Sequence, residues 1–208
     1  MVIVRDLLRE QWTALRAWIE DSGLLEHLDD PSALEGWTVQ DLITHTGQSF
    51  LAFTLLGPAS GATPLSIRSY ISHYQSAAQQ IASGTRELSR SFTGDLLGGV
   101  DRCAVLGFRA LDGLTAEVVR GGRGAITLDD FVLTRLLELV VHGDDLGRSV
   151  REVGPAPING NVVTEVSQML IDAYIDATGR PPEVTDEMAW IRLATGRTAS
   201  DDTSLPLL

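Results

Sequence analysis

The stretch from Thr127 to Ser149, TLDDFVLTRLLELVVHGDDLGRS, decides the fold. On a helical wheel at about 100° per residue, its apolar residues cover most of the circumference. A surface helix needs a much narrower apolar arc, so this helix, predicted over residues 128–150, is expected to contact neighbours on several sides. Thr127 and Asp130 form the T-x-x-D pattern of a helix start. The segment therefore predicts a helical protein in which this helix is largely buried.

A polar stripe interrupts the apolar surface of this helix, and it contains Thr134, Arg135, Glu138, His142 and Asp145. Glu138 and His142 are four residues apart, so both side chains lie on one face, within reach of one ion. Arg135 and Glu138 would also make an ordinary surface pair at i,i+3. From this helix alone, the favoured interpretation is a strip that faces solvent. The alternative is a set of groups that faces an internal cleft.

Helical periodicity dominates the rest of the chain, and it predicts further helices at about 8–19, 38–56, 63–81, 100–119, 162–178 and 185–195. The Gly-rich stretch 120–124 indicates a turn or short hairpin, and no convincing strand series is present. Pro155 and Pro157 mark the one candidate linker. These patterns predict an all-α fold, an antiparallel four-helix bundle over residues 1–150. Residues 151–208 are expected to form a helical extension that packs on the bundle within one domain.

The second helix supplies a third potential metal ligand. It starts with a T-x-x-D pattern that ends at Asp41, and His45 lies on its polar side. A catalytic zinc site needs three nitrogen or oxygen ligands and an open position, which His45, Glu138 and His142 would provide. Asp41 and Asp145 lie one turn from His45 and His142, so they are candidate acceptors that fix the imidazole tautomers. Capping of the helix is the favoured role of Asp41.

Composition excludes several classes of function. The formal net charge is −12, which repels phosphate backbones, so no nucleic-acid partner is expected. The single cysteine, Cys103, rules out an internal disulfide and is predicted to be a buried hydrophobe rather than a nucleophile. No run of roughly 18 apolar residues is present, and residues 1–12 have no secretory apolar core. We therefore expect no membrane span and a cytoplasmic location.

The remaining histidines and arginines give weaker signals. His27 and His73 are predicted to lie at the surface. Arg109 and Arg197, like Arg135, are candidates for binding an anionic substrate by residue type only.

Three segments resemble the mycothiol-dependent maleylpyruvate isomerase family, which belongs to the DinB-like metal-binding superfamily. Residues 36–49, GWTVQDLITHTGQS, resemble the family's W-[ST]-V-x-D-L-x-x-H helix start. Residues 127–149 resemble its later metal helix, R-x-x-E-x-x-x-H-x-x-D-L. Residues 190–197, WIRLATGR, resemble its L-x-x-x-G-R segment. The resemblance spans most of the chain in order, and it rests on the combination of motifs rather than on one of them.

The resemblance implies a DinB-like bundle that holds one divalent metal, usually zinc, through His45, Glu138 and His142. It also implies mycothiol, a small thiol, as cosubstrate in the isomerisation or transfer of a small electrophile. Zinc lowers the pKa of a bound thiol and so presents a thiolate at neutral pH. Nickel, cobalt or iron would suit the same ligands. Arg135 and Asp145 are the candidate catalytic residues.

Two alternatives stay open from the sequence. A metal-dependent hydrolase would use a metal-bound water, with Asp41 or Asp145 as its base. A non-catalytic helical binding protein would leave the polar stripe in solvent without a metal. The residues after Pro157 are predicted as helices, whereas the isomerase has a separate small C-terminal domain, which argues against maleylpyruvate itself as substrate. The protein is expected to be a monomer or a homodimer.

Overall fold

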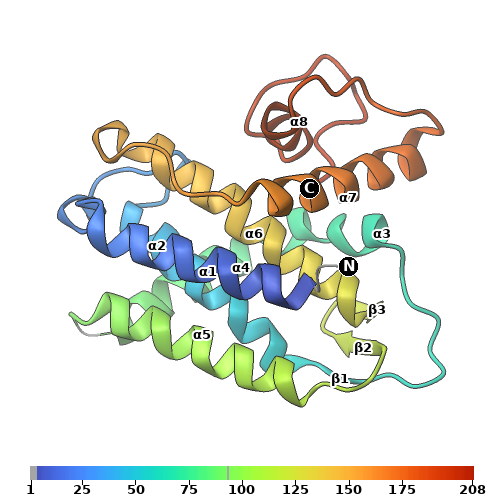
Figure 1. Ribbon diagram of the computed structural model, residues 1–208, viewed down its shortest axis with the longest axis horizontal. Coiled ribbons are helices and arrows are strands. Elements are labelled where there is room, and N and C mark those ends of the chain that lie inside the picture. Colours follow the sequence, from blue (N-terminus) through green and yellow to red (C-terminus); the bar gives the residue numbers. More distant parts are fainter. Residues whose placement is uncertain (1–3, 93) are drawn as a thin grey trace.

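Four helices form the centre of the molecule: α1 (Val4–Asp21), α2 (Val39–Leu51), α5 (Leu96–Gly113) and α6 (Leu128–Ser149). The computed structural model describes residues 4–92 and 94–208, and Figure 1 shows these helices running side by side. Helix α6 contacts both α1 and α2, and α2 packs closely on α5. The predicted all-α class is confirmed.

Burial of α6 explains its wide apolar surface. Leu136, Leu139 and Val140 are fully buried, as the wheel predicted. The polar stripe is buried too, because Arg135 is only 5% exposed and Asp145 is 0% exposed. The interpretation of this stripe as a solvent-facing strip is therefore wrong. The sequence of one helix could not show it, because the partner surface that covers the stripe comes from other segments.

Helix starts follow the predicted capping patterns. The Thr38 side chain accepts a hydrogen bond from the Asp41 backbone N–H, and the Asp41 carboxylate accepts one from the Thr38 N–H, which completes a capping box. At the start of α6, the Thr127 hydroxyl accepts from the Asp130 N–H. These caps fix where the two helices that bear the candidate ligands begin.

The third and fourth predicted helices differ from the observed ones. The segment predicted as one helix from Thr63 consists of α3 (Ile67–Ile71), capped by Ser66, and α4 (Tyr74–Ser91). Helix α5 begins after Asp95, which caps it, and ends at Gly113 rather than near residue 119. The residues beyond α5 enter a strand instead, and short 3-10 turns η1 (Leu24–His27) and η2 (Ala52–Leu55) complete this part of the chain.

A small antiparallel sheet closes one end of the bundle. It consists of β1 (Gly57–Pro58), β2 (Val118–Gly121) and β3 (Gly124–Thr127) in the order β1-β2-β3. The hairpin of β2 and β3 confirms the turn expected at 120–124, and it buries Val119 opposite Ile126. The sheet itself was not predicted, because strands of two to four residues are too short to show an alternating pattern.

The C-terminal part of the chain contains the 3-10 turn η3 (Arg151–Val153), α7 (Gly160–Thr178) and α8 (Glu187–Ala194). Helix α7 packs on α6, α3 and α1, while α8 packs on α7 and lies on the outer side of it in Figure 1. Gly179 ends α7 in the left-handed conformation, φ 72°, which is typical of a glycine at a helix C-terminus. Within the described residues, no helix is long and apolar enough to cross a membrane.

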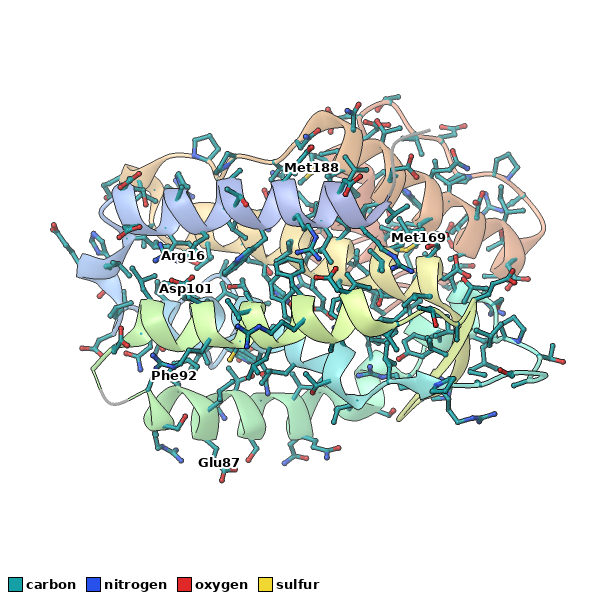
Figure 2. The ribbon with its side chains drawn as sticks, turned by 60° about the horizontal axis from the view of Figure 1, so that its bottom comes forward. Arg16, Glu87, Phe92, Asp101, Met169 and Met188 are labelled. Atoms are coloured by element: carbon teal, nitrogen blue, oxygen red, sulfur yellow. The ribbon has the colours of Figure 1, made fainter. Side chains whose placement is uncertain are left out.

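Two contacts hold α5 in place. The Arg16 guanidinium of α1 donates to both carboxylate oxygens of Asp101 on α5, at 2.7 and 2.9 Å, and Figure 2 labels this pair. On the other side of α5, a Cβ atom at Gly107 would clash with the backbone carbonyl of Phe50 on α2. Glycine at this position therefore permits the close approach of α5 to the helix that carries His45.

Candidate metal centre

His45 of α2 meets Glu138 and His142 of α6 where these helices pack together. One potential ligand atom from each residue lies within 4.8 Å of the other two. Glu138 Oε2 is 3.1 Å from His142 Nε2 and 3.3 Å from His45 Nε2. The three side chains are 9–12% exposed, so they are almost completely removed from water.

The donor set fits a divalent cation such as zinc. In a tetrahedral zinc site with ligand atoms about 2.1 Å from the ion, neighbouring ligand atoms are about 3.4 Å apart. The two distances from Glu138 Oε2, 3.1 and 3.3 Å, are close to this value. Hydrogen bonds between the carboxylate and protonated imidazole nitrogens account for the same distances without an ion. Two imidazoles and one carboxylate leave one tetrahedral position for an exchangeable ligand.

Asp145 contacts the ring nitrogen of His142 that does not face Glu138. Its Oδ2 atom is 3.2 Å from His142 Nδ1, and Arg197 Nη2 donates to the same oxygen at 2.9 Å. Burial opposes ionisation of Asp145, but the hydrogen bonds with His142 and Arg197 lower the pKa of this carboxyl below its usual value. A carboxylate on Nδ1 keeps the proton there, which leaves the Nε2 lone pair free for a cation.

The charges of the ligand residues also favour cation binding. Burial disfavours the charged form of Glu138, but hydrogen bonds with His142 and His45 outweigh it and hold the pKa of Glu138 well below its usual value. Burial likewise lowers the pKa of His142, whereas its hydrogen bonds with Asp145 and Glu138 raise this pKa above the ordinary value. The two carboxylates thus provide negative charge at the point where both imidazoles converge.

His45 is held by residues that the sequence did not single out as partners. Its Nδ1 atom lies 3.2 Å from Gln48 Oε1 and 3.4 Å from Thr85 Oγ1, and Trp37 packs edge-on against the ring at 5.4 Å. Gln48 is one turn from His45 on the same helix, so the sequence spacing alone places the two side chains on one face. Thr85 comes from α4, and no local pattern marks it.

Asp41 does not contact His45. Its carboxylate caps α2 and lies 3.8 Å from the Arg86 guanidinium. The favoured prediction for Asp41, capping of the helix, is confirmed, and its alternative role as the acceptor for His45 is wrong.

Arg135 lies beside the ligand set without facing the open cavity. Its Nη2 atom donates to the Tyr74 hydroxyl at 2.6 Å and is 3.6 Å from Glu138 Oε1. Burial raises the pKa of Tyr74, so the phenol stays neutral at pH 7 and can accept this hydrogen bond. The guanidinium carbon of Arg123 lies 4.5 Å from the centre of the Tyr74 ring.

A cavity of about 280 Å³ opens beside His45, Glu138 and His142. Tyr74 and Arg197 also line it. Its apolar walls come from Leu34, Trp37, Ile81, Leu137 and Val141, among others. The site can therefore present a bound cation to a small molecule in largely apolar surroundings.

The other candidates named from the sequence lie elsewhere. Arg109 is exposed on α5, and His73 is exposed at the start of α4. His27 pairs with Asp30 at 2.7 Å in η1. Cys103 is buried as predicted, and burial raises the pKa of its thiol, which argues against a nucleophilic role.

Residues 8–147 match the family model of the mycothiol maleylpyruvate isomerase N-terminal domain. The match covers more than half of the chain and includes all three candidate ligands. The chain belongs to this family. No curated protein and no solved structure matched in the other two comparisons. Membership in the mycothiol maleylpyruvate isomerase family indicates a mycothiol-related, DinB-like metal-binding function, and it confirms the resemblance stated from the motifs.

Proposed function

We propose that the protein is a metal- and mycothiol-dependent isomerase or transferase that acts on a small electrophile. In this proposal His45, Glu138 and His142 hold the metal, with zinc as the first choice. The observation that carries it is the convergence of the three ligand atoms within 4.8 Å beside a cavity, in a chain of a mycothiol family. We further propose a cytoplasmic location, where a small thiol stays reduced.

When bound, zinc would supply Lewis acidity that lowers the pKa of the thiol and makes its sulfur nucleophilic at neutral pH. Glu138 contributes a carboxylate that is already ionised at pH 7. His142 contributes Nε2, because its Nδ1 proton is held by Asp145. His45 completes the set from the neighbouring helix.

Arg135 and Asp145 fit positioning roles in this proposal. Neither residue lines the cavity, so each acts through a neighbour. Asp145 fixes the tautomer and ring orientation of His142. Arg135 holds Tyr74 at the cavity wall and stabilises the charge of Glu138.

The cavity suits an isomerisation through thiol addition. The sulfur adds to one carbon of a conjugated double bond, rotation follows about the resulting single bond, and elimination returns the thiol and the isomerised product. Apolar walls formed by Leu137, Val141 and Trp37 limit the access of competing water. A volume of about 280 Å³ lies near the lower end of the usual range for ligand sites, about 300–1,000 Å³, so the proposal concerns a small substrate.

The geometry gives less support to a hydrolase. A hydrolase would need a carboxylate that is free to take a proton from water. Asp145 is fully occupied by His142 and Arg197, and its side chain is 1% exposed. Asp41 is the cap of α2 and contacts none of the candidate ligands.

Metal analysis tests the site. Protein purified without added metal is expected to contain one divalent ion per chain, and His142→Ala should lose it. His73→Ala is the matched control, because His73 is exposed on another helix. Absence of metal in the parent protein, or equal metal content in both variants, would refute the metal centre and favour a binding protein.

Spectroscopy tests the use of thiol separately. A cobalt-loaded sample titrated with mycothiol should develop a thiolate-to-metal absorption band, and substrate profiling should show turnover that depends on mycothiol. Unchanged spectra at saturating thiol, together with turnover that needs no thiol, would instead support the hydrolase.

A further inference from the structure

A second and larger cavity lies on the other side of α6. This arginine cleft has a volume of about 670 Å³ and is bounded by the end of α6, η3, the loop at 154–158, and α8. Three arginines, Arg148, Arg151 and Arg192, line it around one carboxylate, Asp144. It shares no lining residue with the cavity beside His45, Glu138 and His142. The cleft is thus a separate site, and its chemistry does not depend on the proposed metal centre.

The arginines leave the cleft with an excess of positive charge. Arg192 forms a two-pronged pair with Asp144, at 2.5 and 2.8 Å, and this pair fixes the plane of its guanidinium. Arg148 is 3.8 Å from the same carboxylate and makes no hydrogen bond with it. Among the residues that the structure describes, no carboxylate pairs with Arg151. One negative charge therefore faces three positive ones in a protein whose overall formal charge is −12.

Among the described residues, no other acid hydrogen-bonds an arginine of the cleft, although the charges of Asp186 and Asp145 add to that of Asp144 in raising the pKa of Arg192. Asp145, next in sequence to Asp144, turns to the opposite side of α6, where it binds His142 and Arg197. Asp186 caps α8 by accepting a hydrogen bond from the Ala189 N–H at 2.7 Å. The donors of Arg148 and Arg151 consequently remain available to a ligand.

The remaining walls of the cleft are mostly apolar or backbone. Ile158, Val163 and Met188 are among its lining residues, and Figure 2 labels Met188 on α8. At its floor, Gly147 of α6 lies against the backbone of residues 154–156, where a Cβ atom would be within 3.1–3.3 Å of backbone atoms. The cleft therefore combines guanidinium groups with an apolar surface of the size that a metabolite could cover.

We propose that the arginine cleft binds a small organic oxyanion, a molecule that joins a phosphate or carboxylate group to an apolar body. The anionic group is held by the guanidinium groups of Arg148 and Arg151, which offer forked pairs of N–H donors suited to planar or tetrahedral oxyanions. Arg192, fixed by Asp144, forms the third side. The apolar body lies against Ile158, Val163 and Met188.

Calorimetric titration with phenylphosphonate tests this proposal, because the probe has one oxyanion and one apolar ring and cannot be hydrolysed as an ester. The titration is made with a chelator present, because a phosphonate oxygen could also bind a metal at its exchangeable position. The parent protein and His142→Ala should then bind it equally, since the cleft shares no lining residue with the metal centre. Arg148→Gln combined with Arg151→Gln should weaken binding by on the order of 10-fold or more. Both arginines are exposed, so the double variant is expected to keep the melting temperature of the parent.

Two controls decide whether the site is specific. Arg109→Gln, an exposed arginine on α5, should leave the affinity unchanged, and benzyl alcohol, which lacks the charge, should bind at least about 10-fold more weakly than phenylphosphonate. The proposal is overturned if phenylphosphonate does not bind, if Arg109→Gln weakens it as much as the double variant does, or if His142→Ala alone abolishes binding. Equal affinity for the alcohol would show an apolar pocket without anion recognition and would also overturn it.

Discussion

Asp144 and Asp145 are neighbours on α6, yet Asp145 contacts the candidate metal ligand His142 and Asp144 lines the arginine cleft. The side chain of Asp145 is 1% exposed, accepts hydrogen bonds from one imidazole and one guanidinium, and lies next to the lining of a cavity of about 280 Å³. Asp144 is 11% exposed and is outnumbered by arginines in a cleft of about 670 Å³. Both aspartates are held by arginines from the same C-terminal segment, Arg192 and Arg197.

The difference between the two aspartates shows that the role of a carboxylate depends on the side chains it pairs with. Beside His142 in an enclosed place, it orients a potential metal ligand, so small displacements matter. Beside three guanidinium groups near the surface, it fixes one of them and leaves the others with spare charge. Substitutions on the two sides of α6 should accordingly have separable effects.

The largest effect is expected at the ligand set itself. Glu138→Gln removes the charged ligand and should weaken the affinity for zinc by more than about 100-fold, because loss of even an outer partner costs about 10–100-fold. Elemental analysis and competition with a chromogenic chelator measure it. Glu165→Gln, at an exposed position on α7, serves as the control. Retention of full metal content by Glu138→Gln would exclude Glu138 as a ligand.

Substitution of the two aspartates tests the comparison directly. Asp145→Asn should weaken metal affinity by about 10–100-fold, because His142 loses the acceptor that fixes its tautomer. Asp144→Asn should leave metal affinity unchanged, since the ion pairs of Asp144 among the described residues are with Arg192 and Arg148, not with a candidate ligand. The same chelator competition measures both variants. Equal losses in the two variants would mean that α6 responds as a whole rather than by its separate sides.

The pH dependence of stability should also report the buried side of α6. In the metal-free protein, the pKa values of Glu138 and Asp145 lie below their unfolded values of about 4, so their stabilisation is present above pH about 4 and is lost as the pH falls through the folded pKa. The raised pKa of His142 acts in the other direction, because its contribution is present below pH about 6.5 and is lost as the pH rises through the folded pKa.

Urea unfolding in the presence of a chelator, repeated from pH about 3 to about 8, measures this dependence. Asp145→Asn should flatten the acid side of the profile, because it removes a carboxyl whose pKa is lowered in the folded protein. An acid side that is equally steep in Asp145→Asn and the parent protein would contradict the assignment of Asp145.

The smallest effect is expected for the ion pair in the arginine cleft. Arg192→Gln breaks the pair with Asp144, but the Arg192 side chain is 38% exposed, so the free energy of unfolding should fall by about 1 kcal/mol or less. Metal content should remain that of the parent protein. Chemical denaturation at low and high salt checks the first expectation, and a loss of metal would show that this pair also supports the metal centre.

Features that depend on one helix could be predicted from the sequence. The start of α2 at Thr38, the extent of α6 and the spacing of Glu138 and His142 follow from capping chemistry and the helical period. The grouping of His45 with that helix was a hypothesis from the ligand requirement of zinc, which the family resemblance supported, because periodicity alone does not say which helices touch.

Features that depend on contacts between distant segments could not be predicted. From the sequence of α6 alone, solvent exposure was the favoured interpretation of its polar stripe and an internal cleft the alternative, because nothing within the helix shows what covers it. No sequence pattern marks Tyr74 as a partner of Arg135, since only the packing of α4 places its hydroxyl on that side chain. The arginine cleft brings together Arg148 and Arg192 from helices separated by α7, and no local pattern marks such a meeting.

Arg197, by its position, links the C-terminal segment to the candidate metal centre. It lies beyond the family-matched residues 8–147, yet it binds Asp145 and lines the cavity beside the candidate ligands. We therefore propose that residues 151–208 belong to the same domain as the bundle. Exchange of the C-terminal segment should then alter the cavity without changing the candidate ligands, because Arg197 and Leu208 of that segment line the cavity beside them. Chimaeras that graft this segment onto a related bundle should inherit substrate preference from the graft and metal affinity from the host.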